Sequence, residues 1–520
     1  MRPHARPAED SAFLTFARNV STRYLAIAVN ALVGLVVLPI NVHYLGTSAY
    51  GLWMLSASVT TYFSVLDLGY GSAVVKFVAE YRAKRNPRAL NEILSTLFTV
   101  FTLIGVAAYA IALVVAALMP VIFNLDPAQV NTGRIVLLII AANVTLHFIC
   151  AVYGGVVNGF QRYYLNNVIG TVTSIAGAVV NVAILWLGYG LIELVAATTL
   201  VRMAPYFLYR RNAIRAFPEL SLRFGSFSRE RLREVTGFSV WVAIIDWSAR
   251  LSYSIDPLMI GIFLNTAAVG VYAVGLRLSE VLLRMTNQLQ VFLFPAVVHR
   301  AVTGRVEDQR HLFVRATRFQ IAVAIALCAM VAADADILIR TWVGAGFENG
   351  VVTAQILAGV VILRAWMAMP GTLLKGSGQH PFFAKVAAAS TVANVLLSVG
   401  LVQILGVVGV ALGTLIPAAT VASCVLFPAA CREVALPVAE GYRRVVWPAV
   451  WPAIFVVAAV AFTRHAIPPR LVAVLAHLAA GAVTYAAVFF TFGLEREERQ
   501  WFTRKMTELW RRRSQALAAA

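Results

Sequence analysis

Charged side chains inside long apolar stretches are the residues of this sequence best placed to do chemistry. Asp246, Arg250 and Asp256 all lie within the apolar range 237–263. Asp246 and Arg250 are four residues apart and therefore share one face of a helix, with Asp256 at its edge. A charge at the centre of a membrane helix costs about 2.5–3.5 kcal/mol on insertion scales, so such residues normally face a protein interior. These three residues therefore mark a candidate functional site.

Further charges follow in the other apolar ranges. Arg277, Glu280 and Arg284 form one stripe along the range 268–298, because residues three and four apart are neighbours on a helix. Consecutive membrane helices run antiparallel, so we expect Arg277 at a depth similar to that of Arg250. The remaining ranges contribute Asp67, His147, Arg202 and Arg364.

Two interpretations of these charges stay open. In the first, the arginines line a polar cavity and hold an anion, since a guanidinium stays charged when desolvated and can grip two phosphate oxygens. The acids would then orient the arginines, or one acid would take up a coupling ion. In the second, arginines and acids only neutralise one another and tie the helices together. The candidate binding residues are Arg250, Arg277, Arg284 and Arg364, and the candidate orienting or coupling acids are Asp246, Asp256, Glu280 and Asp67.

Two of the isolated charges also have a purely structural interpretation. Asp67 could cap a helix or pair with Lys76, because it lies near the inner end of its apolar range. Arg202 could pair with Glu193 or extend its head group toward the membrane surface.

The elements that position these residues are membrane-spanning helices. The chain has 520 residues, of which 60% are hydrophobic, and its mean hydropathy is +0.78. Apolar stretches of about 20 residues, enough to cross the hydrocarbon as a helix, recur almost end to end. We therefore expect an all-α polytopic membrane protein with about fourteen spans. Their ranges are 21–43, 50–75, 93–121, 134–157, 165–187, 190–210, 237–263, 268–298, 317–340, 350–374, 382–404, 407–430, 445–463 and 471–493.

The distribution of charge orients these spans. The net charge is +19, and most Lys and Arg lie at the termini and on alternate connections such as 76–92, 210–236 and 299–318. The opposite connections hold only Arg134, Arg340, Arg464 and Arg470. This positive-inside pattern predicts that both termini are cytoplasmic. The basic loops then face anionic membrane lipids, and no alternation of basic and aromatic residues indicates nucleic-acid binding.

A weak internal repeat predicts two similar lobes. Leu45–Gly51 is echoed by Leu264–Gly270, and Gly159–Arg162 is echoed by Gly376–Gln379 in the same order. Duplicated membrane folds are usually transporters that move one half against the other. The expected organisation is an N-terminal six-helix lobe (1–210), a basic cytoplasmic linker (211–236), a C-terminal six-helix lobe (237–431), two appended helices (432–493) and an amphipathic cytoplasmic tail (494–520).

The familiar enzyme motifs give no better explanation. Asp334-Ala335-Asp336 has the D-x-D spacing of metal-dependent glycosyltransferases, but it falls at the predicted outer end of a span, where no nucleotide sugar is available. The glycines of Gly371–Gly378 do not form a P-loop. We therefore expect no catalytic residues, no metal site and no cofactor, and the chain is not expected to be an enzyme.

The first-half motifs resemble those of a known family. Tyr44–Trp53, Leu66–Gly71 and Val78–Glu80 are similar to segments of polysaccharide and O-antigen flippases, which belong to the multidrug, oligosaccharidyl-lipid and polysaccharide exporter superfamily. Ile337–Gly344 and Gly371–Gln379 resemble the matching second-half segments. The resemblance covers about residues 20–430 and, because the opening motif is shared widely in the family, it says little about the substrate.

The resemblance implies a function. Flippases of this family carry an undecaprenyl-pyrophosphate-linked oligosaccharide, a precursor of lipopolysaccharide or exopolysaccharide, across the bacterial inner membrane by alternating access. It implies basic cavity residues for the pyrophosphate, coupling to protons or sodium in some members, and a polysaccharide polymerase or glycosyltransferases as partners. Two alternatives stay open: a cation-coupled multidrug antiporter of the same superfamily, and a membrane glycan ligase or polymerase. The aromatic residues available to stack on sugar faces are Trp241, Trp247, Tyr253 and Trp366.

Overall fold

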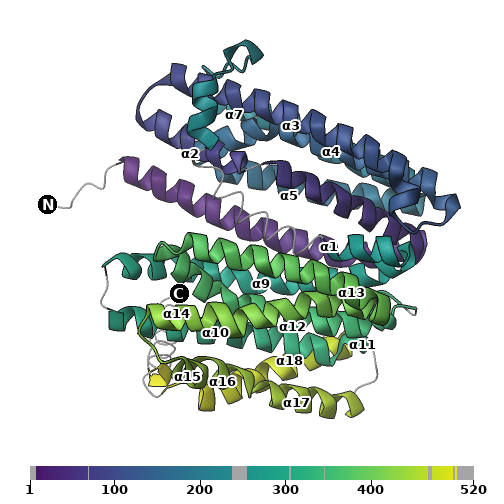
Figure 1. The fold of residues 1–520 in the computed structure, drawn as a ribbon, viewed down its shortest axis with the longest axis vertical. Coiled ribbons are helices and arrows are strands. Elements are labelled where there is room, and N and C mark those ends of the chain that lie inside the picture. Colours follow the sequence, from purple (N-terminus) through teal and green to yellow (C-terminus); the bar gives the residue numbers. More distant parts are fainter. Residues whose placement is uncertain are drawn as a thin grey trace, which may run out of the picture. The chain divides into compact units, whose positions relative to one another are not determined.

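The computed structural model describes residues 7–67, 69–236, 255–303, 306–344, 346–466, 471–495 and 498–500. Every regular element in these ranges is a helix, so the expected all-α class is confirmed (Figure 1). Asp246, Arg250, Trp241, Trp247 and Tyr253 lie outside the described residues, as does most of the predicted cytoplasmic tail.

The first half of the chain begins with a long helix that contains a sharp bend. Helix α1, Pro7–Phe63, has a non-helical glycine at Gly46 (φ 76°), which separates two of the predicted spans. The second of these spans, predicted as 50–75, is not one continuous helix: α1 ends at Phe63, a 3-10 turn follows, and Gly69 (φ 76°) precedes the next helix. The other first-half helices are α2 (Tyr70–Ala83), α3 (Pro87–Ile122), α4 (Pro127–Gly159), α5 (Tyr163–Trp186), α6 (Leu191–Met203) and α7 (Pro205–Ala216).

The second half also contains a long helix that is interrupted by a glycine. Its longest helix, α13 (His380–Thr420), also merges two predicted spans across a bent glycine, Gly406 (φ 57°). The other helices are α9 (Thr266–Thr303), α10 (Val306–Ala333), α11 (Ala335–Trp342), α12 (Asn349–Gly376), α14 (Phe427–Glu433), α15 (Val438–Gly441), α16 (Trp447–Val450), α17 (Ala453–Ala466) and α18 (Leu471–Val488).

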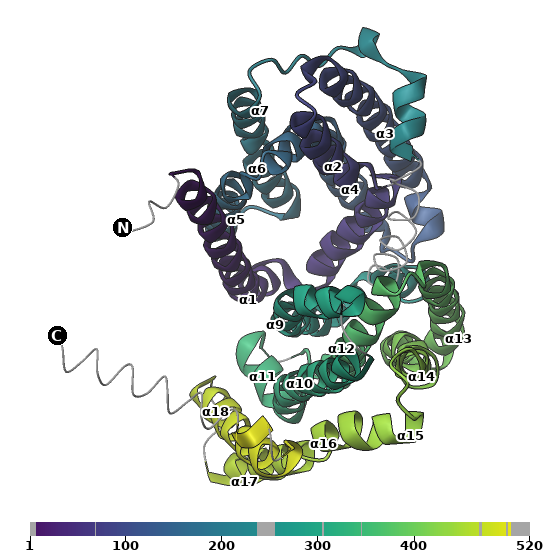
Figure 2. The ribbon, with the colours of Figure 1, turned by 90° about the vertical axis from the view of Figure 1, so that its left-hand side faces the viewer.

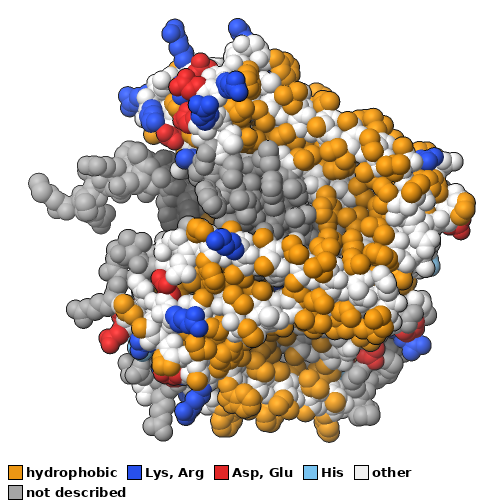
Figure 3. Space-filling model, in the orientation of Figure 1, with side chains coloured by type: hydrophobic (Ala, Val, Ile, Leu, Met, Phe, Trp, Pro, Cys, Tyr) orange, Lys and Arg blue, Asp and Glu red, His pale blue; other side chains and the backbone are white. Residues whose placement is uncertain are grey.

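The helices have the length and polarity of membrane spans. Eleven helical stretches of the described residues are long and apolar enough to cross a bilayer. Two of them, Arg18–Phe63 and Pro381–Glu433, contain the bends at Gly46 and Gly406 and are long enough for two crossings each. Because much of the predicted span 237–263 is not described, the total of fourteen stays a prediction. Large apolar side chains are exposed along α3, including Leu103 and Val106, and Figure 3 shows apolar side chains covering this flank, as lipid contact requires.

The second sequence echo is a repeat of backbone structure. Helices α4 and α12 end at the corresponding glycines, Gly159 and Gly376, and the next helices begin after Arg162 and Gln379. The third residue of each turn has a positive φ, 61° at Gln161 and 83° at Gly378. The three backbone hydrogen bonds that close the first turn have counterparts at the corresponding positions of the second. The repeat therefore extends to individual turns.

The chain packs as two compact units. The first unit comprises Met1–Arg277 and Ala387–Thr414, and the second comprises Leu278–Val386 and Leu415–Ala520. In the first unit α3 packs along α4, and α1 packs along α5 (Figure 2). The helix bundle of this unit surrounds the cavity described below.

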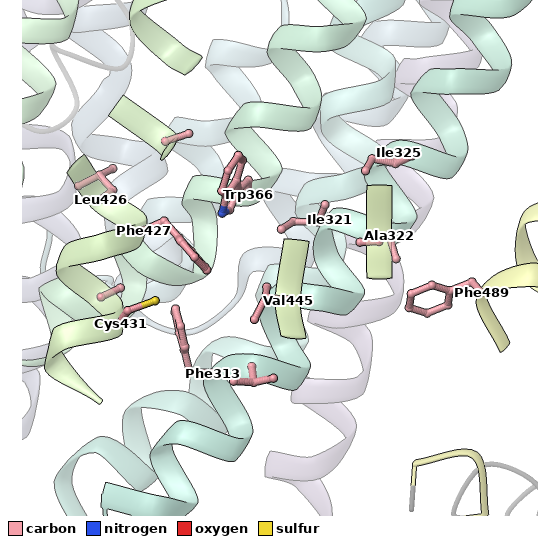
Figure 4. Packing of buried hydrophobic residues seen from close by; sticks show 14 of the residues in the cluster. Phe313, Ile321, Ala322, Ile325, Trp366, Leu426, Phe427, Cys431, Val445 and Phe489 are labelled. Atoms are coloured by element: carbon pink, nitrogen blue, oxygen red, sulfur yellow. The ribbon is translucent and has the colours of Figure 1, made fainter. Parts of the chain in front are cut away.

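The second unit is built around an aromatic core. Trp366 of α12 lies edge-on to Phe427 with ring centroids 5.5 Å apart, and Phe313 of α10 stacks on the same phenylalanine at 6.1 Å. Figure 4 shows these rings beside Cys431 and Val445. Trp366 is 9% exposed and therefore belongs to this core rather than to a sugar-stacking surface.

Candidate functional site

Among the predicted arginines that the structure describes, Arg277 makes a close contact with a neighbouring helix. It lies on α9 within the first unit, half-buried, and its guanidinium rests against the backbone of Gly34 on α1. A Cβ built on Gly34 would come within 1.8 Å of the Arg277 Nη2 atom. Only glycine leaves room for the guanidinium in this position, so the sequence of α1 helps to place the charge.

Glu280 and Arg284 of the same helix favour the neutralisation interpretation. Their side chains form an ion pair one helical turn apart, with 3.7 Å between Glu280 Oε2 and Arg284 Nη2. The two side chains are 38% and 43% exposed, so the pair contributes little to stability. Glu280 therefore neutralises part of the Arg284 charge within this helix.

Asp256 is the most deeply buried of those predicted acids that the structure describes. It is 2% exposed and accepts hydrogen bonds from the hydroxyl groups of Tyr272 on α9 and Thr414 on α13. The distances from Thr414 Oγ1 to the two carboxylate oxygens are 3.0 and 3.1 Å. Within the described part of the chain, no basic side chain lies within 4 Å of Asp256. A buried carboxylate in such surroundings needs a bound proton or cation to offset its charge.

The groups around Asp256 are oxygen donors suited to such a cation. Asn394 Nδ2 donates to Thr414 Oγ1 at 2.8 Å, which leaves the amide oxygen of Asn394 buried without a described hydrogen-bond partner. Ser398 lies one helical turn further on α13, and its hydroxyl is also buried without a described hydrogen-bond partner. Hard cations prefer carboxylate, amide and hydroxyl oxygens. We call this group of five residues the Asp256 cluster: Asp256, Tyr272, Asn394, Ser398 and Thr414.

Asp67 has a structural role and also lines a cavity. Its Oδ1 accepts a hydrogen bond from the Gly71 backbone N–H at 3.0 Å, so it caps the start of α2 as one interpretation predicted. The cavity beside it, inside the first unit, has a volume of about 550 Å³ and also exposes His147 of α4 and Arg202 of α6. The predicted pairing of Arg202 with Glu193 is not formed, because Glu193 instead accepts from the Gly190 backbone N–H.

Arg364 belongs to the second unit. It lies half-buried on α12, two residues before Trp366 of the aromatic core. Its predicted role in anion binding stays a prediction, as do the roles of Asp246 and Arg250, which lie outside the described residues.

Several buried polar residues of this site were not predicted from the sequence. The neutral members of the Asp256 cluster could not be recognised by charge within an apolar sequence. They are Tyr272, Asn394, Ser398 and Thr414. The spacing of Asn394 and Ser398, which places two polar groups on one helix face, was the available clue. A buried hydrogen-bonded pair was also missed.

This missed pair explains the D-x-D motif. Asp334 accepts from or donates to His477 of α18, with 2.7 Å between Asp334 Oδ2 and His477 Nδ1, and both side chains are almost fully buried. Asp334 therefore has a partner inside the second unit, and the spacing with Asp336 reflects a helix junction rather than a metal site.

Solved membrane proteins share this fold. The inward closed conformation of the lipid II flippase MurJ matches with a TM-score of 0.71 at 13% identity, covering 90% of this chain and 98% of MurJ. An inward-facing multidrug resistance MATE transporter of the MOP superfamily matches with a TM-score of 0.60 at 17% identity, covering 79% of this chain and 99% of the other. The chain is thus a multi-pass membrane protein with the helical fold of this transporter superfamily.

Sequence comparison identifies the family. The model of a family described as polysaccharide biosynthesis protein matches residues 16–300, more than half of the chain, and the chain belongs to this family. The probable flippase AglR of Haloferax volcanii is 22% identical over 407 residues, which are 77% of this chain and 80% of AglR. EpsK of Bacillus subtilis, an uncharacterized membrane protein, is 21% identical over 358 residues, 67% of this chain and 70% of EpsK.

Proposed function

We propose that this protein is a transporter, not an enzyme, that flips an undecaprenyl-pyrophosphate-linked oligosaccharide across the bacterial inner membrane by alternating access. Membership of the polysaccharide biosynthesis family and similarity to a probable flippase support the substrate class. The positive-inside pattern supports an orientation with both termini in the cytoplasm. The prenyl chain would stay in lipid while the polar head group crosses inside the protein.

The contact between Arg277 and Gly34 is the observation that carries this proposal. A guanidinium seated on the backbone of a neighbouring helix provides a charge with paired N–H donors at a defined position. Such a group suits a pyrophosphate, whose oxygens accept parallel hydrogen bonds from one guanidinium. Arg250 and Arg364 are proposed as further contacts, and Arg284 as a weaker one because of its ion pair with Glu280.

The Asp256 cluster is proposed to couple transport to an ion gradient. A carboxylate with neutral oxygen donors around it can bind a sodium ion, or can bind a proton and remain neutral. Because Tyr272, Thr414 and Asp256 come from three different helical segments, loading the cluster would favour one arrangement of these segments over another. This gives the ion a physical means of biasing the transport cycle.

Replacement of Arg277 tests the proposal. We expect Arg277→Gln to abolish surface glycan and to leave lipid-linked precursor on the inner leaflet, while Arg277→Lys retains partial activity because it keeps the charge but not the planar donors. Gly34→Ala should resemble Arg277→Gln in direction, since its methyl group displaces the guanidinium. Arg215→Gln, at an exposed position of α7, is the matched control. Normal surface glycan with Arg277→Gln at wild-type protein levels would overturn the proposed role.

A cation-coupled multidrug antiporter is the second candidate function. The shared fold of a MATE transporter and the buried Asp256 support it. This function predicts resistance to cationic dyes that depends on Asp256 and is insensitive to Arg277. A glycan polymerase or ligase would instead join sugars in vitro with lipid-linked substrates. Glycosyltransferase or polymerase genes beside this gene would favour the flippase and supply its expected partners.

A further inference from the structure

The cavity in the first unit contains a second set of polar side chains, separate from Arg277 and the Asp256 cluster. Its volume of about 550 Å³ lies in the range of roughly 300–1,000 Å³ that is usual for small-molecule sites. The walls come from the second part of α1, from α3, α4 and α6, and from the turn that precedes α2. The polar residues that line it are Thr60, Thr61, Asp67, Asn143, His147, Thr198, Thr199 and Arg202.

Arg202 places a positive charge in this cavity, and no acid of the described residues forms an ion pair with it. No carboxylate oxygen of the described chain lies within 4 Å of its guanidinium. Glu193, the acid of the same helix, is occupied at the start of α6, where it accepts from the Gly190 backbone N–H at 3.1 Å. A guanidinium that faces a cavity in an apolar bundle, without an acid in contact, attracts an anionic ligand.

Asn143 adds a hydrogen-bond donor to the same cavity. Its Oδ1 accepts from the Tyr206 hydroxyl at 3.2 Å, which fixes the orientation of the amide. The Nδ2 atom is buried and has no hydrogen-bond partner among the described residues. Buried donors are normally satisfied, so this amide is expected to donate to a ligand.

Asp67 supplies acceptors on another wall. One carboxylate oxygen holds the Gly71 N–H, and a carboxylate can accept several hydrogen bonds in total. The cavity therefore combines a cation, an amide donor and a carboxylate acceptor with apolar surface from Trp53 and Phe101. Carbohydrates carry both hydroxyl donors and apolar ring faces, and they match this combination.

We propose that this cavity is a second ligand site, which binds a sugar residue bearing a carboxylate or phosphate group. The anionic substituent pairs with Arg202, Asn143 donates to the same sugar, and Asp67 accepts from its hydroxyl groups. The inference rests on the proposed function, because the sugar would belong to the transported glycan. It would make the first unit a selector for acidic glycans, with neutral sugars held only through their hydroxyl groups.

Binding of small probes to the purified full-length protein tests this site. Isothermal titration at constant ionic strength would compare glucuronate, glucose 1-phosphate and glucose. We expect at least one anionic sugar to bind about tenfold or more tightly than glucose, and the comparison of the two anions separates carboxylate from phosphate recognition. Arg202→Gln should reduce anion binding to the level of glucose, whereas Arg211→Gln, at an exposed position on α7, should leave it unchanged.

A second variant shifts the affinity in the opposite direction. Asp67→Asn keeps an oxygen that can accept the Gly71 N–H but removes a negative charge from the cavity, so anionic sugars should bind a few-fold more tightly. Equal affinity for the three sugars, or anion binding that survives Arg202→Gln, would overturn the proposal. If Arg202→Gln does not fold, the Asp67→Asn variant decides the test. Anion binding by Asp67→Asn that is unchanged or weaker than in the wild-type protein would then overturn the proposal.

The binding readout is independent of flipping. A strain that lacks the protein but has normal surface glycan would refute the proposed function. If the purified protein still binds anionic sugars through Arg202, the proposed site would nevertheless stand. Loss of surface glycan in Arg277→Gln without any anion selectivity in vitro would refute the site and keep the proposed function.

Discussion

Gly51 of α1 lies directly against the backbone carbonyl of Thr266 at the start of α9. A Cβ built on Gly51 would come within 1.8 Å of the Thr266 oxygen. The relationship is reciprocal, because a Cβ on Gly270 would come within 2.3 Å of the Thr47 carbonyl oxygen. Thr47 and Gly51 correspond to Thr266 and Gly270 in the two repeated segments, so each copy of the repeat packs its glycine on the threonine backbone of the other.

Side chains reinforce this contact between the repeated segments. Ser48 Oγ and Thr266 Oγ1 are 2.8 Å apart, and Gln129 bridges them, donating to Ser48 at 2.7 Å and accepting from Thr266 at 3.0 Å. The contact joins a helix of the first half of the sequence, α1, to a helix of the second half, α9. A movement of one repeated segment against the other would therefore have to change this contact.

Gly51→Ala is predicted to destabilise the protein. The clashing atom is a backbone oxygen, which cannot move away as a side chain can, so the helices must separate at a cost of about 1–3 kcal/mol in the free energy of unfolding. Gly270→Ala should act in the same way with a smaller effect, since its contact is less close. Thermal unfolding of the purified protein measures the change.

Gly177→Ala is the matched control for this prediction. Gly177 lies inside α5 with no atom within 4 Å of a Cβ added there, so alanine should be neutral or slightly stabilising. Unfolding temperatures of Gly51→Ala and Gly177→Ala that do not differ would show that the close approach of the two segments is not formed in solution.

The sequence predicted the helical class well because apolar length and glycine positions act locally. Gly46 and Gly406 interrupt apolar stretches that are too long for one crossing, and both adopt positive φ angles. The break at Asp67–Gly69 was not predicted, since its apolar background continues on both sides. Gly69 adopts the αL conformation, which separates α2 from the preceding turn. Local hydropathy does not indicate this backbone conformation.

The candidate site was predicted less completely because contacts between distant residues decide it. Charge identified Asp256 and Arg277, whose burial in an apolar sequence is unusual. The groups that define their surroundings are neutral or small: Thr414 and Asn394 beside Asp256, and Gly34 beneath Arg277. Residues of these types are common in membrane helices, so only the tertiary arrangement distinguishes them.

The two repeated turns differ in the residue that occupies the position with positive φ. Gln161 has a φ of 61°, whereas the corresponding residue of the second repeat is Gly378, with a φ of 83°. Positive φ costs a residue with a side chain roughly 1–2 kcal/mol, so Gln161→Gly should be neutral or stabilising by up to about 1 kcal/mol. Gly378→Gln should destabilise by a similar amount. Thermal unfolding checks both, and a loss of stability in Gln161→Gly together with a gain in Gly378→Gln would contradict the assignment of equivalent turns.

Replacement of Asp256 tests whether its cluster binds a coupling ion. Asp256→Asn keeps the shape and an acceptor for the Thr414 hydroxyl but removes the negative charge. If sodium binds there, sodium chloride should raise the unfolding temperature of the wild-type protein above its value in choline chloride, and Asp256→Asn should lose this difference. If a proton binds there, transport should depend on the pH gradient in the wild-type protein and not in the variant.

Two further comparisons complete the test of the Asp256 cluster. Ser398→Ala removes one oxygen donor and should weaken a sodium effect without abolishing it, because Asp256 and Thr414 remain. Glu219→Gln replaces an exposed acid and should preserve the wild-type response. A sodium or pH-gradient response that persists in Asp256→Asn would place the coupling ion elsewhere.

A cluster of ion pairs near the C-terminal end of the second unit predicts a specific pH dependence. Glu495 accepts from Arg444 at 3.1 Å and from Arg318 at 3.5 Å, and Glu498 pairs with the buried Arg318. Burial raises the pKa of Glu495, but the hydrogen bond from Arg444 and the charges of Arg318 and Arg444 outweigh burial, so the pKa lies below its usual value of 4.5. Because the folded-state pKa is lowered, the ionised carboxylate stabilises the folded protein above pH 4.5, and this contribution is lost as the pH falls through the folded-state value.

Glu495→Gln should therefore destabilise the protein at neutral pH and much less in acid. The expected loss is a few tenths to about 1 kcal/mol, since Glu495 is 36% exposed and solvent screens its charge. Thermal unfolding from about pH 7 to about pH 2.5 should show the wild-type and variant curves converging at the acidic end, below the lowered pKa of Glu495. Glu440→Gln, which removes only the more exposed partner of Arg444, should have a smaller effect. A constant difference between wild type and Glu495→Gln across this range would show that the glutamate contributes by packing and not by its charge.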